Sequence, residues 1–291
     1  MNRYFRAVGF LNNFTRAEYE KLVEDIMFRP DISLDSFPAG SGSMVIDKNL
    51  ECGNKKGICV RIVKDDTGSV YRETVFPYFR TERYIKHDMC SFEKKLTGEE
   101  YLGVYEDLNL GENLFFYVLN ADEVIKRYKK NGPSEVSISA LSIAGNVILP
   151  IKKNEKQKED VIEFNNNRIR LLNKANDGDQ NAFATVRHDD IMTNVTVSEQ
   201  IYVESMDIYS VVDSSFIPCG AECDLYSVLG DIVSVMKDRN TLTGENVYIL
   251  DVCVKGISLP ICINEKDLLG EPQPGFRFKG TVWLQGYIKP E

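Results

Sequence analysis

The clearest pattern of apolar and polar positions near the N-terminus predicts a helix that begins after Thr15. Thr15 and Glu18 have the spacing of a capping box, and apolar residues follow at helical intervals as far as Met27. Pro30 marks the end of this helix. Before it, the short apolar run of residues 4–10 is typical of a strand.

Strand-like alternation of apolar residues follows this helix. The predicted hairpins pair residues 58–62 with 70–79, and 136–143 with 147–151 around Gly145-Asn146. Between the hairpins, an apolar run at 114–119 leads into a helix capped by Asn120. This order predicts an α+β fold with a mixed or mostly antiparallel sheet and helices packed on one face.

After residue 151, the pattern of apolar and polar residues changes first to a polar segment with helices and then to strands. Residues 152–160 are all charged or polar, which is typical of a linker, and residues 161–174 and 180–188 follow as short helices. Five strands are then predicted at 208–217, 225–236, 247–254, 257–263 and 280–288, enough for a small β-barrel of OB-like type.

Chain length and pattern together predict two compact units joined by a connector. At 291 residues, 43% of them apolar, the chain can bury two cores of ordinary size. We therefore predict an α+β domain at 1–151, a charged linker and helical connector at 152–200, and a barrel domain at 201–291.

The charge and the cysteine content restrict which kinds of partner and which cellular compartment we expect. The net charge is −9, and residues 200–291 alone carry 7 basic against 13 acidic residues, or −6. Such a surface disfavours nucleic acid and anionic membranes as partners. Seven cysteines at irregular spacing in a long chain indicate reduced thiols, and no apolar run is long enough to span a bilayer. The expected location is the cytoplasm.

Familiar catalytic and metal-binding patterns are missing from the sequence. Only His87 and His188 could act as imidazole bases, and each His-Asp pair lacks the further ligands of a metal-dependent phosphohydrolase. The four cysteines nearest to a zinc-site spacing are Cys219, Cys223, Cys253 and Cys262, but the last two are nine positions apart on predicted strands. We therefore predict no catalytic residue, no cofactor and no metal.

One candidate ligand surface remains in the C-terminal unit. Arg277 and Lys279 alternate with aromatic residues shortly before Trp283, an arrangement with which OB-type barrels stack bases and contact phosphates. The same alternation is what a half-buried strand requires, and core packing is the favoured interpretation. Together with the carboxylates of Glu222 and Asp224, these three residues form the candidate surface.

Several segments also carry a family resemblance. They are Tyr4 to Phe10, Pro218-Cys219-Gly220, Glu222-Cys223-Asp224, Tyr226 to Gly230 and above all Arg277 to Gly286. In these segments the chain resembles bacterial proteins of one of the domain-of-unknown-function families. The resemblance implies a cytoplasmic bacterial protein, and it brings no reaction, cofactor or site residue with it.

Three functions follow as hypotheses. The leading one is a non-enzymatic binding or adaptor protein for a protein partner or a small ligand, and the chain could form a homo-oligomer. The second is an enzyme of unfamiliar type that uses carboxylates and tyrosines, and the third is a binder of single-stranded nucleic acid or nucleotides through the C-terminal barrel. A pocket that holds carboxylates of perturbed pKa would favour the enzyme. An apolar surface patch would favour the adaptor, and a basic groove at Arg277 and Lys279 would favour the nucleic-acid binder.

Overall fold

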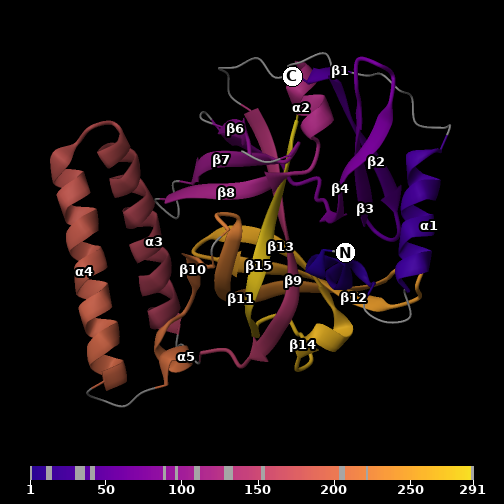
Figure 1. Ribbon diagram of the computed structural model, residues 1–291. Coiled ribbons are helices and arrows are strands. Elements are labelled where there is room, and N and C mark those ends of the chain that lie inside the picture. Colours follow the sequence, from indigo (N-terminus) through magenta and orange to yellow (C-terminus); the bar gives the residue numbers. More distant parts are fainter. Residues whose placement is uncertain are drawn as a thin grey trace.

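The structure is a computed structural model that describes residues 2–10, 15–29, 37–39, 43–87, 90–95, 98–107, 112–127, 134–151, 155–202, 207–220 and 222–289. The fold is α+β, as the sequence predicts. A four-stranded sheet and a larger sheet that closes into a barrel form the body, and two long helices stand beside it (Figure 1).

The four-stranded sheet has the order β1-β2-β3-β4, and all its neighbouring strands are antiparallel. Its strands are β1 (Phe37–Ala39), β2 (Ser43–Glu51), β3 (Lys56–Lys64) and β4 (Val70–Phe79). The predicted first hairpin is β3–β4. Asp65 closes its turn, because a carboxylate oxygen accepts hydrogen bonds from the backbone N–H groups of Thr67 (3.0 Å) and Ser69 (2.8 Å).

Helix α1 (Arg16–Met27) packs against β2 and β3 of this sheet. It begins with the predicted capping box, in which Thr15 and Glu18 each satisfy a backbone N–H of the other. Buried Tyr19, Val23 and Ile26 form its apolar stripe. This helix is therefore as the sequence predicts.

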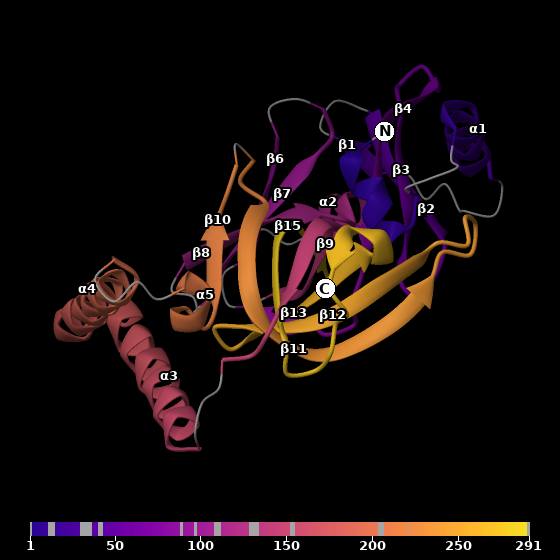
Figure 2. The same ribbon diagram turned by 90° about the horizontal axis from the view of Figure 1, so that it is seen from below.

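The barrel is a closed ring of five strands (Figure 2). Its members are β9 (Ser134–Ile148), β11 (Leu225–Arg239), β12 (Asn246–Val254), β13 (Ile257–Asn264) and β15 (Arg277–Ile288). The ring closes because β15 pairs with both β11 and β9, while β9 also pairs in parallel with β13. The predicted five-stranded barrel is confirmed. In chain order the ring strands are β9, β11, β12, β13 and β15, so the short helix η2 (Glu265–Asp267) lies before the last strand, whereas an OB fold has its helix between the third and fourth strands.

The fifth strand of the ring is not the predicted one. Residues 208–217 were expected to supply it, but Ile208–Val211 form helix α5 and Ser215–Pro218 form β10, which pairs only with β11. β9 takes the place instead. It also replaces the predicted hairpin at Gly145-Asn146, because residues on both sides of Gly145 pair with the same strand, β15. A Cβ on Gly145 would lie 2.5 Å from the ring of Phe278, so this glycine permits close packing rather than a turn.

β9 therefore links the predicted N-terminal unit to the barrel. It lies before residue 151, yet it supplies one of the five barrel strands. The division into 1–151, 152–200 and 201–291 stays a prediction. What the structure adds is that residues 201–291 contain only four strands of the ring.

Successive side chains along the barrel strands point to opposite faces of the sheet, and the two faces belong to different hydrophobic cores. Ile261 and Leu284 belong to the core inside the barrel. Their chain neighbours Cys262 and Trp283 point the other way and belong to a second core, shared with the four-stranded sheet β1–β4 (sheet A) and the N-terminal residues. Each of these strands thus contributes to both cores.

The N-terminal segment covers the outer face of β13. Residues 4–10 were expected to form a strand, but Arg3–Val8 form the 3₁₀-helix η1, which ends at Gly9 with φ of 93°. Cys262 Sγ lies 3.3 Å from the carbonyl oxygen of Ala7, and Asn264 Nδ2 donates to the carbonyl of Arg6 over 3.2 Å. A seven-residue apolar run fits a strand or a short helix equally well, and packing on β13 decides between them.

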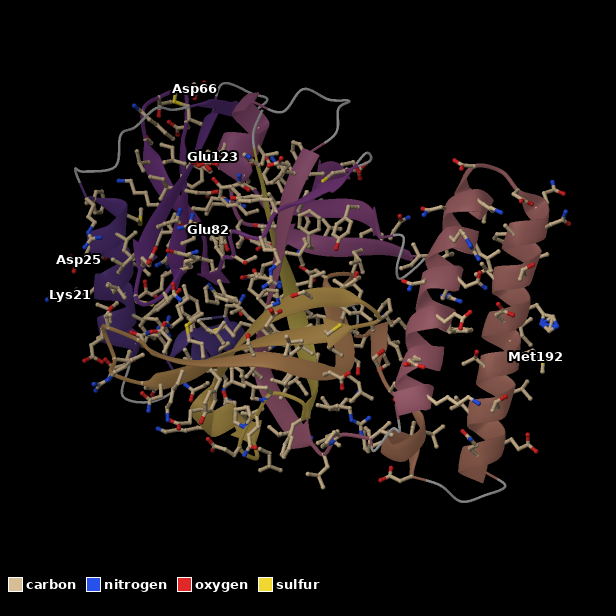
Figure 3. All side chains as sticks on the ribbon, turned by 180° about the vertical axis from the view of Figure 1, so that it is seen from behind. Lys21, Asp25, Asp66, Glu82, Glu123 and Met192 are labelled. Atoms are coloured by element: carbon tan, nitrogen blue, oxygen red, sulfur yellow. The ribbon has the colours of Figure 1, made fainter. Side chains whose placement is uncertain are left out.

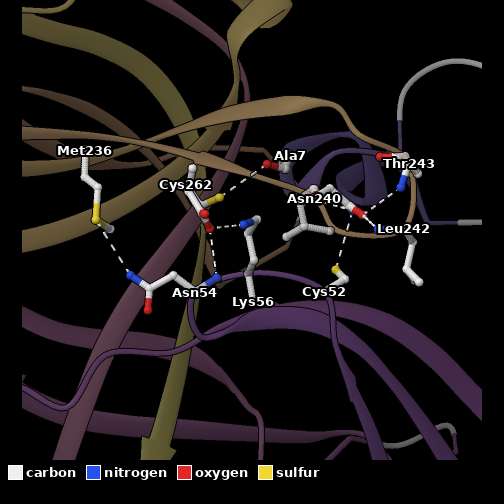
Figure 4. Close-up of polar contacts among 11 residues, drawn as sticks. Ala7, Cys52, Asn54, Lys56, Met236, Asn240, Leu242, Thr243 and Cys262 are labelled. Atoms are coloured by element: carbon white, nitrogen blue, oxygen red, sulfur yellow. Dashed lines mark hydrogen bonds and ion pairs between the residues drawn. The ribbon is translucent and has the colours of Figure 1, made fainter.

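Side-chain hydrogen bonds join sheet A to the β11–β12 hairpin (Figure 4). The fully buried ammonium group of Lys56 pairs with Asp238, and the backbone N–H of Asn54 donates to the same carboxylate over 2.8 Å. Nearby, Asn240 donates to the carbonyl of Val8 over 2.8 Å. Sheet A, η1 and the barrel are therefore held as one packed body.

The remaining strands border this body. β6 (Cys90–Lys94), β7 (Tyr101–Asp107) and β8 (Glu112–Val118) form an antiparallel extension of the larger sheet, and β8 pairs in parallel with β15. Helix α2 (Ala121–Arg127) follows β8. The short strands β5 (Ile85–His87) and β14 (Leu268–Leu269) pair with β9.

The helical connector is confirmed, but its helices are longer than predicted. α3 (Glu155–Asn176) and α4 (Gln180–Tyr202) form a hairpin beside the barrel. Residues 155–160 of the expected linker belong to α3, because a charged segment without Gly or Pro can form an exposed helix. Residues 152–154 lie outside the described residues. In the part of the chain that the structure describes, no helix is long and apolar enough to cross a membrane.

Candidate functional site

Three of the five predicted surface residues line one cavity. Glu222, Asp224 and Trp283 form part of the wall of an open cavity of about 390 Å³. Its other walls come from η1, β4, β8 and the β6–β7 connection. The volume lies in the range of small-molecule sites, which is about 300–1,000 Å³.

Arg277 and Lys279 lie elsewhere. The guanidinium group of Arg277 is buried and donates to the carbonyl oxygens of Leu149 (3.1 Å), Val212 (3.0 Å) and Tyr209 (2.6 Å). Lys279 donates to Ser227 Oγ over 2.7 Å. Arg277 therefore connects β15 to the two ends of the connector, and each of its three nitrogen atoms already donates a hydrogen bond.

Four aromatic rings form the apolar wall of the cavity. They belong to Tyr4 of η1, Phe76 of β4, Tyr117 of β8 and Trp283 of β15. The Trp283 ring centroid lies 5.1 Å from that of Tyr4 and 5.1 Å from that of Tyr117, and Phe76 lies 4.9 Å from Tyr117. Edge-to-face and tilted contacts of this kind hold the rings in fixed positions.

The hydroxyl group of Tyr117 is buried and has no hydrogen-bond partner among the described residues. The side chain is 2% exposed, and burial raises the pKa of Tyr117 well above its ordinary value, so the phenol is neutral. An unpaired buried hydroxyl costs free energy. Because this oxygen atom is inaccessible from the cavity, Tyr117 contributes to the cavity wall through its ring and not through its hydroxyl group.

Asp224 brings a negative charge to the same cavity. It is 2% exposed, and its carboxylate accepts a hydrogen bond from Trp283 Nε1 over 2.9 Å. The structure gives neither Asp224 nor the exposed Glu222 an ion-pair partner among the described residues. A buried carboxylate whose only side-chain donor is a neutral indole is poorly compensated.

The other charged groups of the cavity largely cancel. Lys95 pairs with Glu100 over 3.3 Å and lies 5.6 Å from the ring centroid of Tyr117. Arg3 lies 5.1 Å from the ring centroid of Tyr4. Burial raises the pKa of Tyr4, Arg3 lowers it, and the two carboxylates near β11 raise it further. Two cations stand against three carboxylates, so the cavity carries a net charge of −1.

A second cavity is smaller and more polar. It measures about 60 Å³ and lies between β2 and α2, where Asp47, Asp122 and Tyr78 line it. Arg61 holds Asp47 with two hydrogen bonds of 2.6 and 2.9 Å. Burial, then the charge of Asp47, raises the pKa of Asp122 to about 7. Such a carboxylic acid could transfer protons at neutral pH, but this cavity has room only for a few water molecules.

No metal site is found in the described ranges, where no three His, Cys, Asp or Glu side chains are grouped to hold an ion. The four cysteines considered for zinc differ in their surroundings, since Cys262 is buried against η1 while Cys223 is exposed. Burial raises the pKa of Cys90 to about 12, which makes it a poor nucleophile.

The sequence did not single out three of the four rings. Tyr4, Phe76 and Tyr117 lie on separate predicted elements, and each fits the apolar pattern of its own element. Only the tertiary packing of η1, β4 and β8 around Trp283 brings them together. The single local signal was Trp283 itself.

Comparisons with known proteins place the chain in a family. The model of a family described as "Domain of unknown function, E. rectale Gene description (DUF3881)" matches residues 5–286. No curated protein and no solved structure matches the chain.

Proposed function

The chain therefore belongs to this family, whose description names no activity, and we propose that it is a binding protein that holds a small organic cation in its aromatic cavity. The observation that carries the proposal is the poorly compensated carboxylate of Asp224 beside four aromatic rings. The proposed role is ligand binding without catalysis.

Aromatic faces and carboxylates attract the same class of ligand. The face of an aromatic ring is electronegative, so an ammonium group that is stripped of water is stabilised above it. Trp283 is the strongest such ring, and Asp224 lies in hydrogen-bond contact with its edge. A ligand that carries one positive charge would neutralise the cavity.

The structure offers less support to the alternatives. A nucleic-acid binder needs an accessible basic groove, whereas the donors of Arg277 contact backbone carbonyls and η1 covers the outer face of β13. An enzyme of the carboxylate type would use Asp122, whose pKa is near 7. That group lines the cavity of about 60 Å³, which lies well below the size of substrate pockets.

Fluorescence titration with matched probes tests the proposal. Trp283 is the only tryptophan in the chain, so its emission reports on the cavity. The probes are choline and 2-phenylethylammonium, with the neutral analogues 3,3-dimethylbutan-1-ol and 2-phenylethanol as controls. We expect saturable changes in emission with the cations and at least about tenfold weaker responses to the neutral molecules. Equal responses within each pair would exclude a cation site, and no saturable response to any probe would refute ligand binding here.

A further inference from the structure

Three charged side chains of the aromatic cavity have no ion-pair partner among the described residues. They are Arg3, Glu222 and Asp224. The other two charged residues of the cavity wall, Lys95 and Glu100, pair with each other over 3.3 Å. A ligand can therefore compensate three charges in this cavity, one positive and two negative.

The three groups lie at different depths. Asp224 is 2% exposed and accepts the indole hydrogen bond of Trp283, so it belongs to the interior of the cavity. Arg3 and Glu222 are exposed, so they lie at its mouth. Burial raises the pKa of Tyr4 most; beyond that, Arg3 lowers it and the two carboxylates raise it, so all three charges lie around one hydroxyl group. The mouth therefore offers one charge of each sign, and the interior offers one negative charge.

We infer that the ligand of this cavity is a basic α-amino acid that enters with its side-chain cation first, an inference that rests on the proposed function of cation binding. At the mouth, its carboxylate lies against Arg3 and its α-ammonium group against Glu222. Inside, its side-chain cation lies against Asp224. An amino acid of this class carries two positive charges and one negative charge at neutral pH, so its net charge offsets that of the cavity wall.

Arg3 has the donors that a carboxylate needs. Its guanidinium carbon lies 5.1 Å from the ring centroid of Tyr4, and among the described residues its side chain donates only a long hydrogen bond of 3.5 Å to the Tyr4 hydroxyl group. A planar guanidinium group can bind both oxygen atoms of a carboxylate at once. The methylene groups of a lysine or arginine side chain pack well on aromatic rings, here those of Tyr4 and Trp283.

Other classes of cation compensate fewer of these charges. A simple monoamine or a quaternary amine pairs with Asp224 and leaves both charges at the mouth unused. A diamine pairs with both carboxylates but brings a second cation close to Arg3. A neutral α-amino acid pairs with Arg3 and Glu222 and leaves the buried carboxylate without a partner, which is the most costly of the three omissions.

Calorimetric titration of the full chain with L-lysine and three analogues tests this inference, because each analogue lacks one charge. Cadaverine lacks the carboxylate, 6-aminohexanoic acid lacks the α-ammonium group, and L-norleucine lacks the side-chain cation. Lysine should bind at least about fivefold more tightly than the first two and at least about tenfold more tightly than norleucine. Cadaverine has the larger positive charge, so attraction by net charge alone would give the opposite order for that pair.

Two variants assign the charges at the mouth. Arg3→Gln should weaken lysine binding about fivefold without weakening that of cadaverine, and Glu222→Gln should weaken lysine binding without weakening that of 6-aminohexanoic acid. Arg16→Gln is the matched control for Arg3, because Arg16 is exposed and lies outside the cavity. It should leave the ratio of the lysine and cadaverine affinities unchanged.

The possible failures are distinguishable. Lysine that binds no more tightly than cadaverine, together with arginine that binds no more tightly than agmatine, its analogue without the carboxylate, would overturn the inference and leave cation binding intact. A preference for lysine that persists in Arg3→Gln would also overturn it, because the carboxylate would then lie elsewhere. No saturable binding of any of these molecules or of choline would refute the proposed function as well.

Discussion

Trp283 Nε1 donates a 2.9 Å hydrogen bond to the buried carboxylate of Asp224. The two residues are 59 positions apart, and the pairing of β11 with β15 places them side by side, with Leu225 opposite Trp283. The backbone continues this pairing, since the N–H of Leu284 donates to the carbonyl of Asp224 over 2.8 Å. The strand register thus fixes a charged group at the edge of the indole ring.

Asp224→Asn should weaken cation binding while the fold persists. The amide oxygen can still accept the Trp283 hydrogen bond, so we expect the free energy of unfolding to stay within about 1 kcal/mol of that of the unchanged chain or to rise, because a poorly compensated charge is removed. Loss of the attraction between the carboxylate and the choline cation, about 1–4 kcal/mol at 4 Å depending on the local dielectric constant, should weaken choline binding about ten- to hundredfold.

Fluorescence titration and urea unfolding of this variant measure the two quantities. Glu271→Gln is the control, since Glu271 is exposed and lies outside the cavity. Unchanged choline affinity in Asp224→Asn would remove Asp224 from the site.

Tyr117→Phe should separate stability from binding. Removal of an unpaired buried hydroxyl group relieves a desolvation cost, so the variant should be about 1 kcal/mol more stable than the unchanged chain. Choline affinity should stay unchanged, because the hydroxyl group is inaccessible from the cavity and the ring is kept. Tyr101→Phe is the matched control, because the Tyr101 hydroxyl group donates to Glu99 over 2.9 Å and its loss should destabilise the fold. If Tyr117→Phe were instead destabilised as much as Tyr101→Phe, the Tyr117 hydroxyl group would have a partner.

Local signals in the sequence were reliable where one short segment decides the structure. The capping box of Thr15 and the turn at Asp65 depend only on side chains that bond backbone groups a few residues away. The apolar, strand-like pattern of the C-terminal residues likewise predicted a barrel, although β13 and β15 are buried on both faces.

The errors have a common physical cause, which is that tertiary pairing overrode a local preference. Gly145-Asn146 is a strong hairpin signal, yet β15 pairs with residues on both sides of it and β9 continues as a single strand. The expected strand at 208–217 is interrupted because Asp207 caps a helical turn through Tyr209 N, and Arg277 binds the carbonyls of that turn. The cavity could not be predicted at all, since four elements contribute one ring each.

The stability of the protein should respond to pH through Asp122. Its pKa is raised from 3.8 in the unfolded chain to about 7 in the fold, because burial and Asp47 disfavour the charged form. The stabilisation that comes from the protonated form is fully present below pH 3.8 and is lost as the pH rises through 7. The contribution of Asp122 to the free energy of unfolding should therefore fall between about pH 4 and pH 7, by at most about 4 kcal/mol.

Urea unfolding of Asp122→Asn across this pH range measures that contribution. The variant should be more stable than the unchanged chain at pH 8, and the difference should shrink toward pH 4. Asp66→Asn, at the tip of the β3–β4 hairpin (Figure 3), is the control and should show no such trend. A difference that is constant with pH would mean that Asp122 titrates near its ordinary value.

The last prediction concerns the autonomy of the C-terminal unit. Residues 201–291 lack β9, so β13 and β15 would each lose a barrel partner, and Trp283 would lose the rings of Tyr4 and Tyr117. We expect this fragment alone to show solvent-exposed tryptophan emission and no cooperative unfolding. Co-expressed fragments 1–178 and 179–291, divided at the turn between α3 and α4, retain every strand of the ring. They should associate and restore native emission. Cooperative unfolding of the isolated 201–291 fragment, with buried tryptophan emission, would instead show that four strands suffice and that the boundary near residue 200 separates independent domains.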